Sequence, residues 1–292
     1  MRDALRYGER FAIISTMNTE FFKVDESKCL KCSLCVRDCA FKALKRTDDG
    51  RPAMAVPARC MRCQHCLAIC PAGAISVDGK DPAEAKATAS LELPSAAAVE
   101  NYILSRRSMR HFKKENVDRA VLERILKTLG NVPTGCNARG LTFTCYPDME
   151  SMDAFRAGFI KAIEEHNTPG KLIPRSIAVP AIRMRKGGED MFFRGASGLL
   201  IISSDETNSE VVTAPQDLAA ACTYFEMLAQ ANSIATCWCG FLNIVQKEIP
   251  ELLEKTSGIR RTTPFNAMLF GIPAVKYART VLRGDYAKID WR

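Results

Sequence analysis

The sequence predicts an α+β protein made of two domains, a small cysteine-rich domain followed by a larger domain of mixed helices and strands. The chain has 292 residues, which is enough for two domains of ordinary size. Eight of its 13 cysteines fall between Cys29 and Cys70, and the other five are scattered. Beyond that segment, helical patterns alternate with short runs of β-forming residues.

We expect four parts along the chain. They are an N-terminal extension over residues 1–20, a cysteine-rich domain over 21–82, a linker over 83–98 and a second domain over 99–292. The extension carries no motif that we can interpret. The linker is rich in alanine, serine, glutamate and proline and has no clear apolar period, which is typical of connecting segments.

Composition excludes several classes of protein. Apolar residues make up 47% and charged residues 25% of the chain, which argues against disorder or a coiled coil. No apolar run approaches the roughly 20 residues that span a bilayer, and the first residues do not resemble a signal peptide. We therefore expect no membrane insertion and a cytoplasmic protein. Disulfides are rare there, so the cysteines indicate metal binding or redox chemistry.

Two runs of cysteines share one spacing. The pattern C-x2-C-x2-C-x3-C covers residues 29–39 and returns over 60–70, where Pro71 follows it. Bacterial two-cluster ferredoxins have this spacing, and the fourth cysteine of each run binds the other cluster. Three thiolates on one tight loop reach three irons of a cube, whereas the fourth iron faces away. The sequence thus predicts two 4Fe-4S clusters, one held by Cys29, Cys32, Cys35 and Cys70 and the other by Cys60, Cys63, Cys66 and Cys39.

The flanks of the two runs also repeat, with a period of 31 residues from Cys29 to Cys60. Residues 21–24 and 74–77 predict strands, and residues 36–40 and 65–69 predict short helical turns. Alanine follows the first run where the pattern has proline. The alternative is a zinc domain, but zinc sites usually combine two separated C-x2-C pairs.

The second domain shows two helical patterns and two short apolar runs. Apolar residues recur at helical spacing over residues 117–129 and again over 217–231. Residues 199–203 and 267–270 are continuous apolar runs that predict buried strands. Mixed signals of this kind predict an α+β sandwich.

Four short motifs follow one another in this domain. Residues 106–110 read R-R-S-M-R, and three cations beside a hydroxyl suit a phosphate group. Residues 133–137 read P-T-G-C-N, and residues 236–240 read T-C-W-C-G. Residues 271–279 begin with G-I-P and contain two cations. An isolated R-R-S run would more often be a solvated helix end, so the argument depends on the four motifs together.

In this order and at these distances, the motifs resemble those of the nitroreductase family of FMN enzymes. The whole chain is similar to the ferredoxin-fused nitroreductases of anaerobic bacteria and archaea. The resemblance implies a bacterial ferredoxin-like domain with two 4Fe-4S clusters, followed by a nitroreductase-like FMN-binding α+β sandwich. It also implies an intertwined homodimer with FMN at the subunit interface. Thr134 and Ile272 depart from the family motifs, which have serine and tyrosine there.

The resemblance gives roles to residues of this chain. Those that would hold the FMN phosphate and ribityl chain are Arg106, Arg107 and Ser108. Those that would come from the other subunit are Pro133, Thr134, Gly135 and Asn137. Those that would line the isoalloxazine ring are Trp238, Cys239 and Gly240. Two further cations would return to the phosphate, chosen from Lys276, Arg279 and the reserve candidate Arg283.

Arg110 is the candidate for a catalytic role, because the resemblance brings it to the pyrimidine edge of the flavin. A cation there stabilises the negative charge of reduced flavin, so Arg110 should raise the reduction potential. Flavin and solvent can supply protons, so no general acid is required. No catalytic triad or pair of carboxylates stands out in the sequence.

The remaining cysteines predict packing rather than chemistry. We expect Cys136, Cys145 and Cys222 to be core thiols. We expect Cys237 and Cys239 to combine packing with flavin lining, with their side chains on opposite faces of a strand.

These observations predict an FMN-dependent oxidoreductase. A low-potential donor, such as ferredoxin or NAD(P)H, would reduce the clusters, which would pass electrons to FMN and then to a small-molecule acceptor. Nitroaromatics are the usual acceptors of the family, and other electron-poor compounds are alternatives. A second hypothesis is a non-enzymatic electron carrier or redox sensor with a degenerate flavin domain. A third keeps the fold but changes the reaction to dehydrogenation or dehalogenation.

The formal net charge of +8 does not indicate a nucleic-acid partner, because no basic stripe with interleaved aromatic residues is present. Eight thiolates with two iron–sulfur cores would remove about four of these charges. A flavin phosphate would remove up to about two more. The excess of cations is thus mostly compensation for bound groups.

Overall fold

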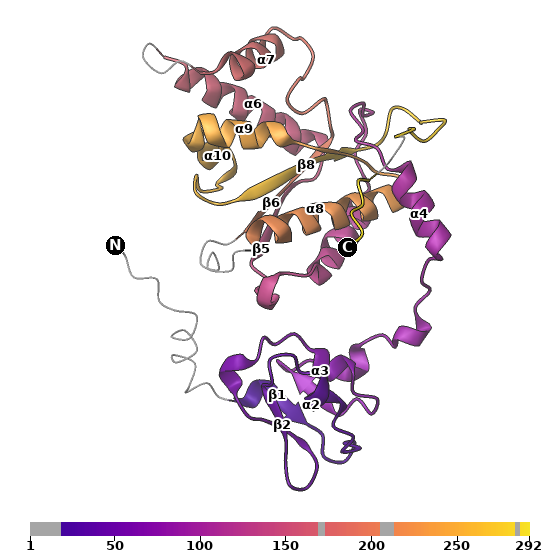
Figure 1. The fold of residues 1–292 in the computed structure, drawn as a ribbon. Helices are drawn as coiled ribbons and strands as arrows, with labels where there is room; N and C mark the ends of the chain where they lie inside the picture. Colours follow the sequence, from indigo (N-terminus) through magenta and orange to yellow (C-terminus); the bar gives the residue numbers. More distant parts are fainter. Residues whose placement is uncertain (1–18, 169–172, 205–212, 284–286) are drawn as a thin grey trace. The chain divides into compact units, whose positions relative to one another are not determined.

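The computed structural model describes residues 19–168, 173–204, 213–283 and 287–292, and its ribbon is shown in Figure 1. It divides into two compact units, Met1–Leu93 and Pro94–Arg292. The division falls inside the stretch that we expected to be a linker. Nearly all of the expected N-terminal extension lies outside the described residues.

The described part of the first unit consists of two short antiparallel strand pairs, two short α-helices and four 3₁₀ turns. The strands are β1 (Phe22–Val24) with β4 (Ile75–Val77), and β2 (Leu44–Arg46) with β3 (Pro52–Met54). The helices are α2 (Leu34–Asp38) and α3 (His65–Ala68). The turns are η1 (Thr19–Phe21), η2 (Pro57–Arg59), η3 (Pro82–Glu84) and η4 (Thr88–Ser90). The predicted strands at 21–24 and 74–77 are confirmed, and they pair with each other. The β2–β3 hairpin was not predicted.

The second unit is built on a four-stranded antiparallel sheet. The strand order is β5-β6-β8-β7. The strands are β5 (Leu141–Tyr146), β6 (Gly198–Ser204), β7 (Ala235–Trp238) and β8 (Phe265–Gly271). Gly198 pairs with Phe270, and a Cβ on Gly198 would lie 2.2 Å from the Phe270 ring, so only glycine fits at this register position.

Seven α-helices belong to the described part of this unit. They are α4 (Ala96–Ser105), α5 (Arg119–Thr128), α6 (Met149–His166), α7 (Arg175–Arg185), α8 (Ala214–Ala231), α9 (Gly240–Glu248) and α10 (Pro250–Ser257). Two 3₁₀ turns, η5 (Leu129–Asn131) and η6 (Gly135–Asn137), follow α5. The predicted helices at 117–129 and 217–231 are confirmed as α5 and α8.

Helices cover both faces of the sheet. Leu199 and Ile201 of β6 pack in one apolar cluster with α6, α7, α9 and α10, whereas Leu200 and Ile202 pack in a second cluster with α5 and α8. The view in Figure 1 agrees, with α9 and α10 above the strands and α8 below them. Because both faces of β6 are buried, its sequence is a continuous apolar run rather than an alternation. The predicted α+β sandwich is confirmed.

None of the helices in the described ranges combines the length and the apolar character that crossing a membrane would require.

Candidate functional site

The four thiols predicted to share the first cluster line one small cavity of the first unit. Cys29, Cys32 and Cys35 reach it from the first loop, and Cys70 reaches it from the second. The two loops have matching backbones. Lys31 and Ser33 have φ angles of 56° and 61°, and the residues 31 positions later, Arg62 and Gln64, have 49° and 62°. These left-handed conformations curl each loop tightly around the place that a cluster would fill.

The second set of thiols also crosses between the loops. Burial raises the pKa of the Cys60 thiol, and the charges of Cys63 and Cys39 raise it further. Cys39 therefore lies within electrostatic reach of the second run, as expected for a ligand that comes from the first run.

Each fourth cysteine accepts a backbone hydrogen bond at the same relative position. Ala43 N–H donates to Cys39 Sγ at 3.3 Å, and Ala74 N–H donates to Cys70 Sγ at 3.3 Å. Amide donors of this kind stabilise the negative charge on a cluster sulfur and help to set its potential. The donor chemistry therefore fits two clusters. No group of three or more His, Cys, Asp and Glu side chains in the described ranges is arranged to hold a single metal ion.

In the second unit, backbone contacts bring three of the four motifs together. Met109 N–H donates to the Thr236 carbonyl at 2.8 Å, and Lys113 N–H donates to the Ile272 carbonyl at 2.9 Å. Between them, Phe112 forms a β-bridge with Pro273. The segment with R-R-S-M-R thus runs beside β7, which carries T-C-W, and beside the G-I-P segment, which begins at the last residue of β8.

Arg106 is held by a buried carboxylate that the motifs do not include. Its Nη1 donates to Glu226 Oε1 at 3.1 Å, and the Thr236 hydroxyl lies 3.4 Å from the same oxygen. Glu226 is 6% exposed and lies on α8. In the sequence, Glu226 is an acid among the apolar residues of the helical pattern over 217–231, and nothing there marked it as a partner of Arg106.

Arg107 has the chemistry of an anion ligand. Its Nη1 donates to the Leu104 carbonyl at 3.0 Å and also contacts the Arg106 carbonyl. Its Nε and Nη2 atoms are buried and have no hydrogen-bond partner among the described residues. Buried guanidinium donors without acceptors are costly, and a phosphate would satisfy them. The residues present therefore fit the phosphate of FMN.

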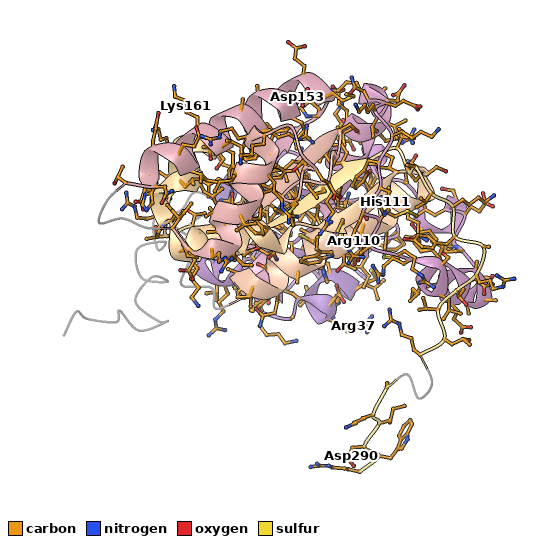
Figure 2. The ribbon with its side chains drawn as sticks, turned by 90° about the horizontal axis from the view of Figure 1, so that it is seen from above. Arg37, Arg110, His111, Asp153, Lys161 and Asp290 are labelled. Carbon is orange, nitrogen blue, oxygen red and sulfur yellow. The ribbon has the colours of Figure 1, made fainter. Side chains whose placement is uncertain are left out.

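Ser108 is half-buried and Arg110 is exposed. Arg110 Nη1 donates to the Ser108 carbonyl at 3.4 Å, so its guanidinium lies close to the motif backbone. Figure 2 labels Arg110 next to His111. The carbonyl of His111 accepts a hydrogen bond from Ala274 N–H at 3.0 Å, which fixes the start of the exposed segment that carries Lys276, Arg279 and Arg283.

The predicted ring-lining residues differ in exposure. Trp238 is 39% exposed and Gly240, the first residue of α9, is exposed, whereas Cys239 is 3% exposed. The Cys239 Sγ points to the Phe192 carbonyl at 3.9 Å, and burial raises the pKa of this thiol to about 12. Its side chain is therefore a neutral core group, and only its backbone remains to line a ligand.

Two expectations about the thiols are wrong. Cys237 and Cys239 do not point to opposite faces but pack in the same apolar cluster. Cys237 lies on β7, where residues two apart share a face, and Cys239 follows directly after the strand. Cys136 is exposed rather than in the core, on a backbone with a φ of 51°. Cys222 is fully buried as expected, in the apolar cluster with α5 and α8 on the other face of the sheet. Cys145 is half-buried against that second cluster.

The fourth motif, the P-T-G-C-N segment, contacts the start of α8. Gly135 N–H donates to the Asp217 carboxylate at 3.0 Å, in the first turn of α8. A Cβ on Gly135 would lie 2.0 Å from Thr213 Oγ1, so the close approach requires glycine. Glu226, which holds Arg106, is nine residues further along α8, or about 13 Å along the helix axis. Within one chain, Gly135 and Arg106 therefore contact α8 at places more than two helical turns apart.

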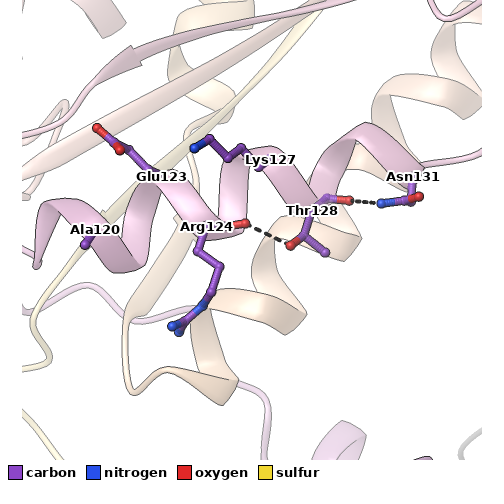
Figure 3. Close-up of a pocket in the computed structure, with 6 residues that line it drawn as sticks. All are labelled: Ala120, Glu123, Arg124, Lys127, Thr128 and Asn131. Carbon is purple, nitrogen blue, oxygen red and sulfur yellow. Dashed lines mark hydrogen bonds between the residues drawn. The ribbon is translucent and has the colours of Figure 1, made fainter. Parts of the chain in front are cut away.

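Two surface hollows of this unit contain none of the motif residues. One has a volume of about 560 Å³ on the outer side of α5 and is shown in Figure 3; its lining residues are Ala120, Glu123, Arg124, Lys127, Thr128 and Asn131. Arg124 is engaged there, since it donates to Asn232 Oδ1 at 2.7 Å. The other hollow is an apolar groove of about 520 Å³ between α4, η5 and α8, with Tyr102, Val132 and Tyr224 among its walls.

Comparison with known families matches both units. A model described as the nitroreductase family matches residues 103–272, and a model described as a 4Fe-4S dicluster domain matches residues 28–75. A search of curated proteins found no significant match.

Solved structures similar to this chain include three proteins of low identity. A nitroreductase with bound FMN from Bacteroides fragilis is 18% identical over 66% of this chain and 98% of its own, with a TM-score of 0.51. A nitroreductase with bound FMN from Desulfitobacterium hafniense is 19% identical over 66% and 97%, with a TM-score of 0.48. A nitroreductase-like family protein from Bacillus cereus is 17% identical over 68% and 99%, with a TM-score of 0.49. At this identity, the first likeness shows the fold of the second unit.

Proposed function

This chain belongs to the nitroreductase family and carries a 4Fe-4S dicluster domain in front of the family domain, and we propose that it is an iron–sulfur flavoenzyme. Electrons from a low-potential donor pass through two 4Fe-4S clusters to FMN, which serves to reduce a nitroaromatic or another electron-poor acceptor. The donor is a ferredoxin or NAD(P)H.

One observation carries the flavin part of the proposal. Three motifs that are far apart in the sequence meet beside β7 and the end of β8, and Arg107 of the first motif has two buried donors that no described residue satisfies. Buried polar groups almost always have partners in folded proteins. An anionic ligand at Arg107 explains this exception, and the FMN-bound nitroreductase from Bacteroides fragilis supports FMN as that ligand.

Bound FMN would supply two-electron reduction of an acceptor, and it accepts electrons one at a time. The residues of this chain would bind and tune it. Arg107 and Ser108 hold the phosphate and ribityl chain, assisted by two cations from the segment that carries Lys276, Arg279 and Arg283. Arg110 provides positive charge at the pyrimidine edge. Trp238 and Gly240 line the ring, since both are exposed close to the point where the R-R-S-M-R segment meets β7.

The proposed assembly is a homodimer with FMN at the interface. The separation of Gly135 from Arg106 along α8 supports this proposal, because a second copy can supply the P-T-G-C-N segment that one chain keeps at a distance. The apolar groove between α4, η5 and α8 offers area that a partner could bury. We place the protein in the cytoplasm, where thiols stay reduced for cluster assembly.

The test is a stepwise reduction of anaerobically purified holoprotein. Iron and flavin assays should give about eight irons and one FMN per chain. Photoreduction of the clusters should then bleach the flavin absorbance without added NAD(P)H. The matched control is Cys66→Ser, which should keep the flavin but slow its bleaching. If the flavin stays oxidised beside reduced clusters while NAD(P)H still drives turnover, the proposed electron path is wrong.

A further inference from the structure

A loop that none of the motifs includes lies directly against two of them. This loop covers residues 190–197, just before β6. The Phe192 ring is 4.4 Å from the Phe241 ring, and the Phe192 carbonyl faces Cys239 Sγ at 3.9 Å. At the other end of the loop, a Cβ on Gly271 would lie 2.9 Å from Ser197 Oγ. The loop therefore lies beside both the T-C-W-C-G and the G-I-P motifs.

The loop is held rigidly. Asp190 accepts hydrogen bonds from Phe193 N–H at 2.8 Å and from Gly195 N–H at 3.1 Å, and its carboxylate pairs with Arg156 Nε at 2.9 Å. Both side chains of that ion pair are about five-sixths buried. Phe192 and Phe193 anchor the loop in the aromatic cluster beneath it, with exposures of 3% and 0%. A residue presented by this loop is therefore preorganised for binding.

That residue is Arg194. It is exposed, although Phe193 and Ala196 around it are buried, and it has a φ of 53°. Left-handed backbone is unfavourable for a residue with a side chain and persists where the surroundings impose it. The loop therefore holds Arg194 in a strained backbone conformation, in which its side chain is exposed to solvent rather than packed in the core.

Arg110 and Arg194 on this side of the unit, like Arg107, have no acidic partner in the described ranges. Arg106 pairs with Glu226 and Arg156 pairs with Asp190, whereas neither Arg110 nor Arg194 forms an ion pair with a described carboxylate. Both are close to one thiol: burial raises the pKa of Cys237, and the charges of Arg110 and Arg194 both oppose that rise. Two unneutralised guanidinium groups beside one site attract an anion.

We propose that Arg194, together with Arg110, forms a cationic rim beside the flavin site that selects an acceptor bearing a carboxylate. This inference rests on the proposed function and adds the class of acceptor to it. A guanidinium recognises a carboxylate through two parallel hydrogen bonds, which an uncharged acceptor of the same shape cannot make. Arg194 is therefore a specificity-determining residue.

The test compares two acceptors that share a nitroarene ring and differ in charge, 4-nitrobenzoate and 4-nitrobenzyl alcohol. Holoenzyme reduced with dithionite is mixed anaerobically with each compound, and flavin reoxidation is followed against acceptor concentration. In Arg194→Gln the half-saturating concentration of 4-nitrobenzoate should rise roughly 10- to 100-fold, the loss expected for a charged hydrogen bond, and that of the alcohol should stay the same. The control is Lys161→Gln on α6, an exposed cation that points away from the sheet (Figure 2) and should change neither value.

A second variant and a binding measurement distinguish the loss of the guanidinium from damage to the loop or loss of turnover. Arg194→Gly suits the left-handed backbone, so it removes the guanidinium without risk to the loop. Titration of oxidised holoenzyme with benzoate, followed by the flavin spectrum, should give weaker binding in both variants. An equal loss for both acceptors, or no loss in benzoate affinity, overturns the role of Arg194. A wild-type protein that holds FMN and binds benzoate but reduces neither nitroarene contradicts the proposed acceptors and leaves the role of Arg194 supported.

Discussion

The candidate sites of the two units differ in how far local sequence predicts them. In the first unit, all eight candidate ligands lie within one short stretch of sequence, and their spacing alone predicts which thiols share a cavity. In the second unit, the candidate site collects residues from segments far apart in the sequence, and a sheet of non-consecutive strands brings them together. Local spacing can therefore predict a metal centre, whereas a flavin site of this kind needs the fold.

The units also differ in what stabilises them. The apolar cluster in the described part of the first unit has five buried residues, Cys35, Leu44, Leu67, Ile75 and Val77, and one of them is a candidate ligand. The second unit has two extensive apolar clusters, one on each face of its sheet. A unit with so small a core usually needs a metal or another crosslink to fold. We therefore expect the first unit to depend on bound clusters for its folding and the second unit to depend on its own apolar side chains.

The largest effect should come from removing the clusters. Oxidation with ferricyanide in the presence of EDTA should unfold the first unit and leave the second folded, because cluster binding supplies most of the folding free energy of the first. Limited proteolysis should then cut within residues 19–93 and spare the rest. Cys222→Ser, a core thiol of the second unit, should keep its iron and resist the same protease. A first unit that remains resistant after losing its iron would show that its few apolar contacts suffice.

The next effect concerns the flavin. Arg107→Ala should weaken FMN binding about 10- to 100-fold, because it removes charged donors that have no other described partner. Fluorescence titration of flavin-free protein measures this affinity, with Arg119→Ala on the exposed side of α5 as the control. Unchanged FMN affinity and turnover would favour the carrier or sensor hypothesis over the enzyme.

The sequence predicted those parts of the fold that a local pattern encodes. The helical stripes of α5 and α8 were identified because their residues face a core at a fixed period. Strands β6 and β8 were identified because a strand buried on both faces is a continuous apolar run. By contrast, β5 is only half-buried along most of its length, and α7 contains Pro180, so neither gives a clean period. Both were missed.

The same limit applies to the candidate site. The arginines of R-R-S-M-R were found because they cluster in the sequence. Their different partners could not be predicted: Arg106 pairs with an acid on α8, whereas Arg107 has unsatisfied donors. Glu226 looked like one polar position in a core helix. Arg194 belongs to no motif, and only the contacts of its loop with Cys239, Phe241 and Gly271 place it beside the site.

A smaller effect should follow from removing Glu226. Glu226→Ala leaves the partly buried Arg106 without its carboxylate, so the second unit should lose about 1–3 kcal/mol of unfolding free energy. Urea unfolding followed by tryptophan fluorescence reports this loss. Both tryptophans, Trp238 and Trp291, belong to the second unit. The control is Glu164→Ala, whose pair with Arg185 is exposed on both sides and should contribute less than about 1 kcal/mol. Equal losses of unfolding free energy in the two variants would show that the partly buried pair stabilises the unit no more than an exposed pair does.

The smallest effect should appear at the start of α6. Asp148 and Ser151 form a capping box, in which Ser151 N–H donates to Asp148 Oδ1 at 2.8 Å and Asp148 N–H donates to Ser151 Oγ at 3.2 Å. The bonds from Ser151 hold the pKa of the Asp148 carboxyl below its usual value of 3.8. Because the folded pKa is the lower one, the stabilisation is complete above the unfolded value and is lost as the pH falls through the folded value.

Asp148→Ala should therefore cost the second unit about 1 kcal/mol at pH 7, the usual value of a helix cap. The difference from the wild type should shrink once the pH falls below the ordinary carboxyl range, since the wild-type side chain is then protonated as well. Urea unfolding monitored by tryptophan fluorescence at pH 7 and at low pH measures both values. A cost that stays constant with pH would mean that the side chain acts by packing rather than by its charge, and the capping argument for α6 would not hold.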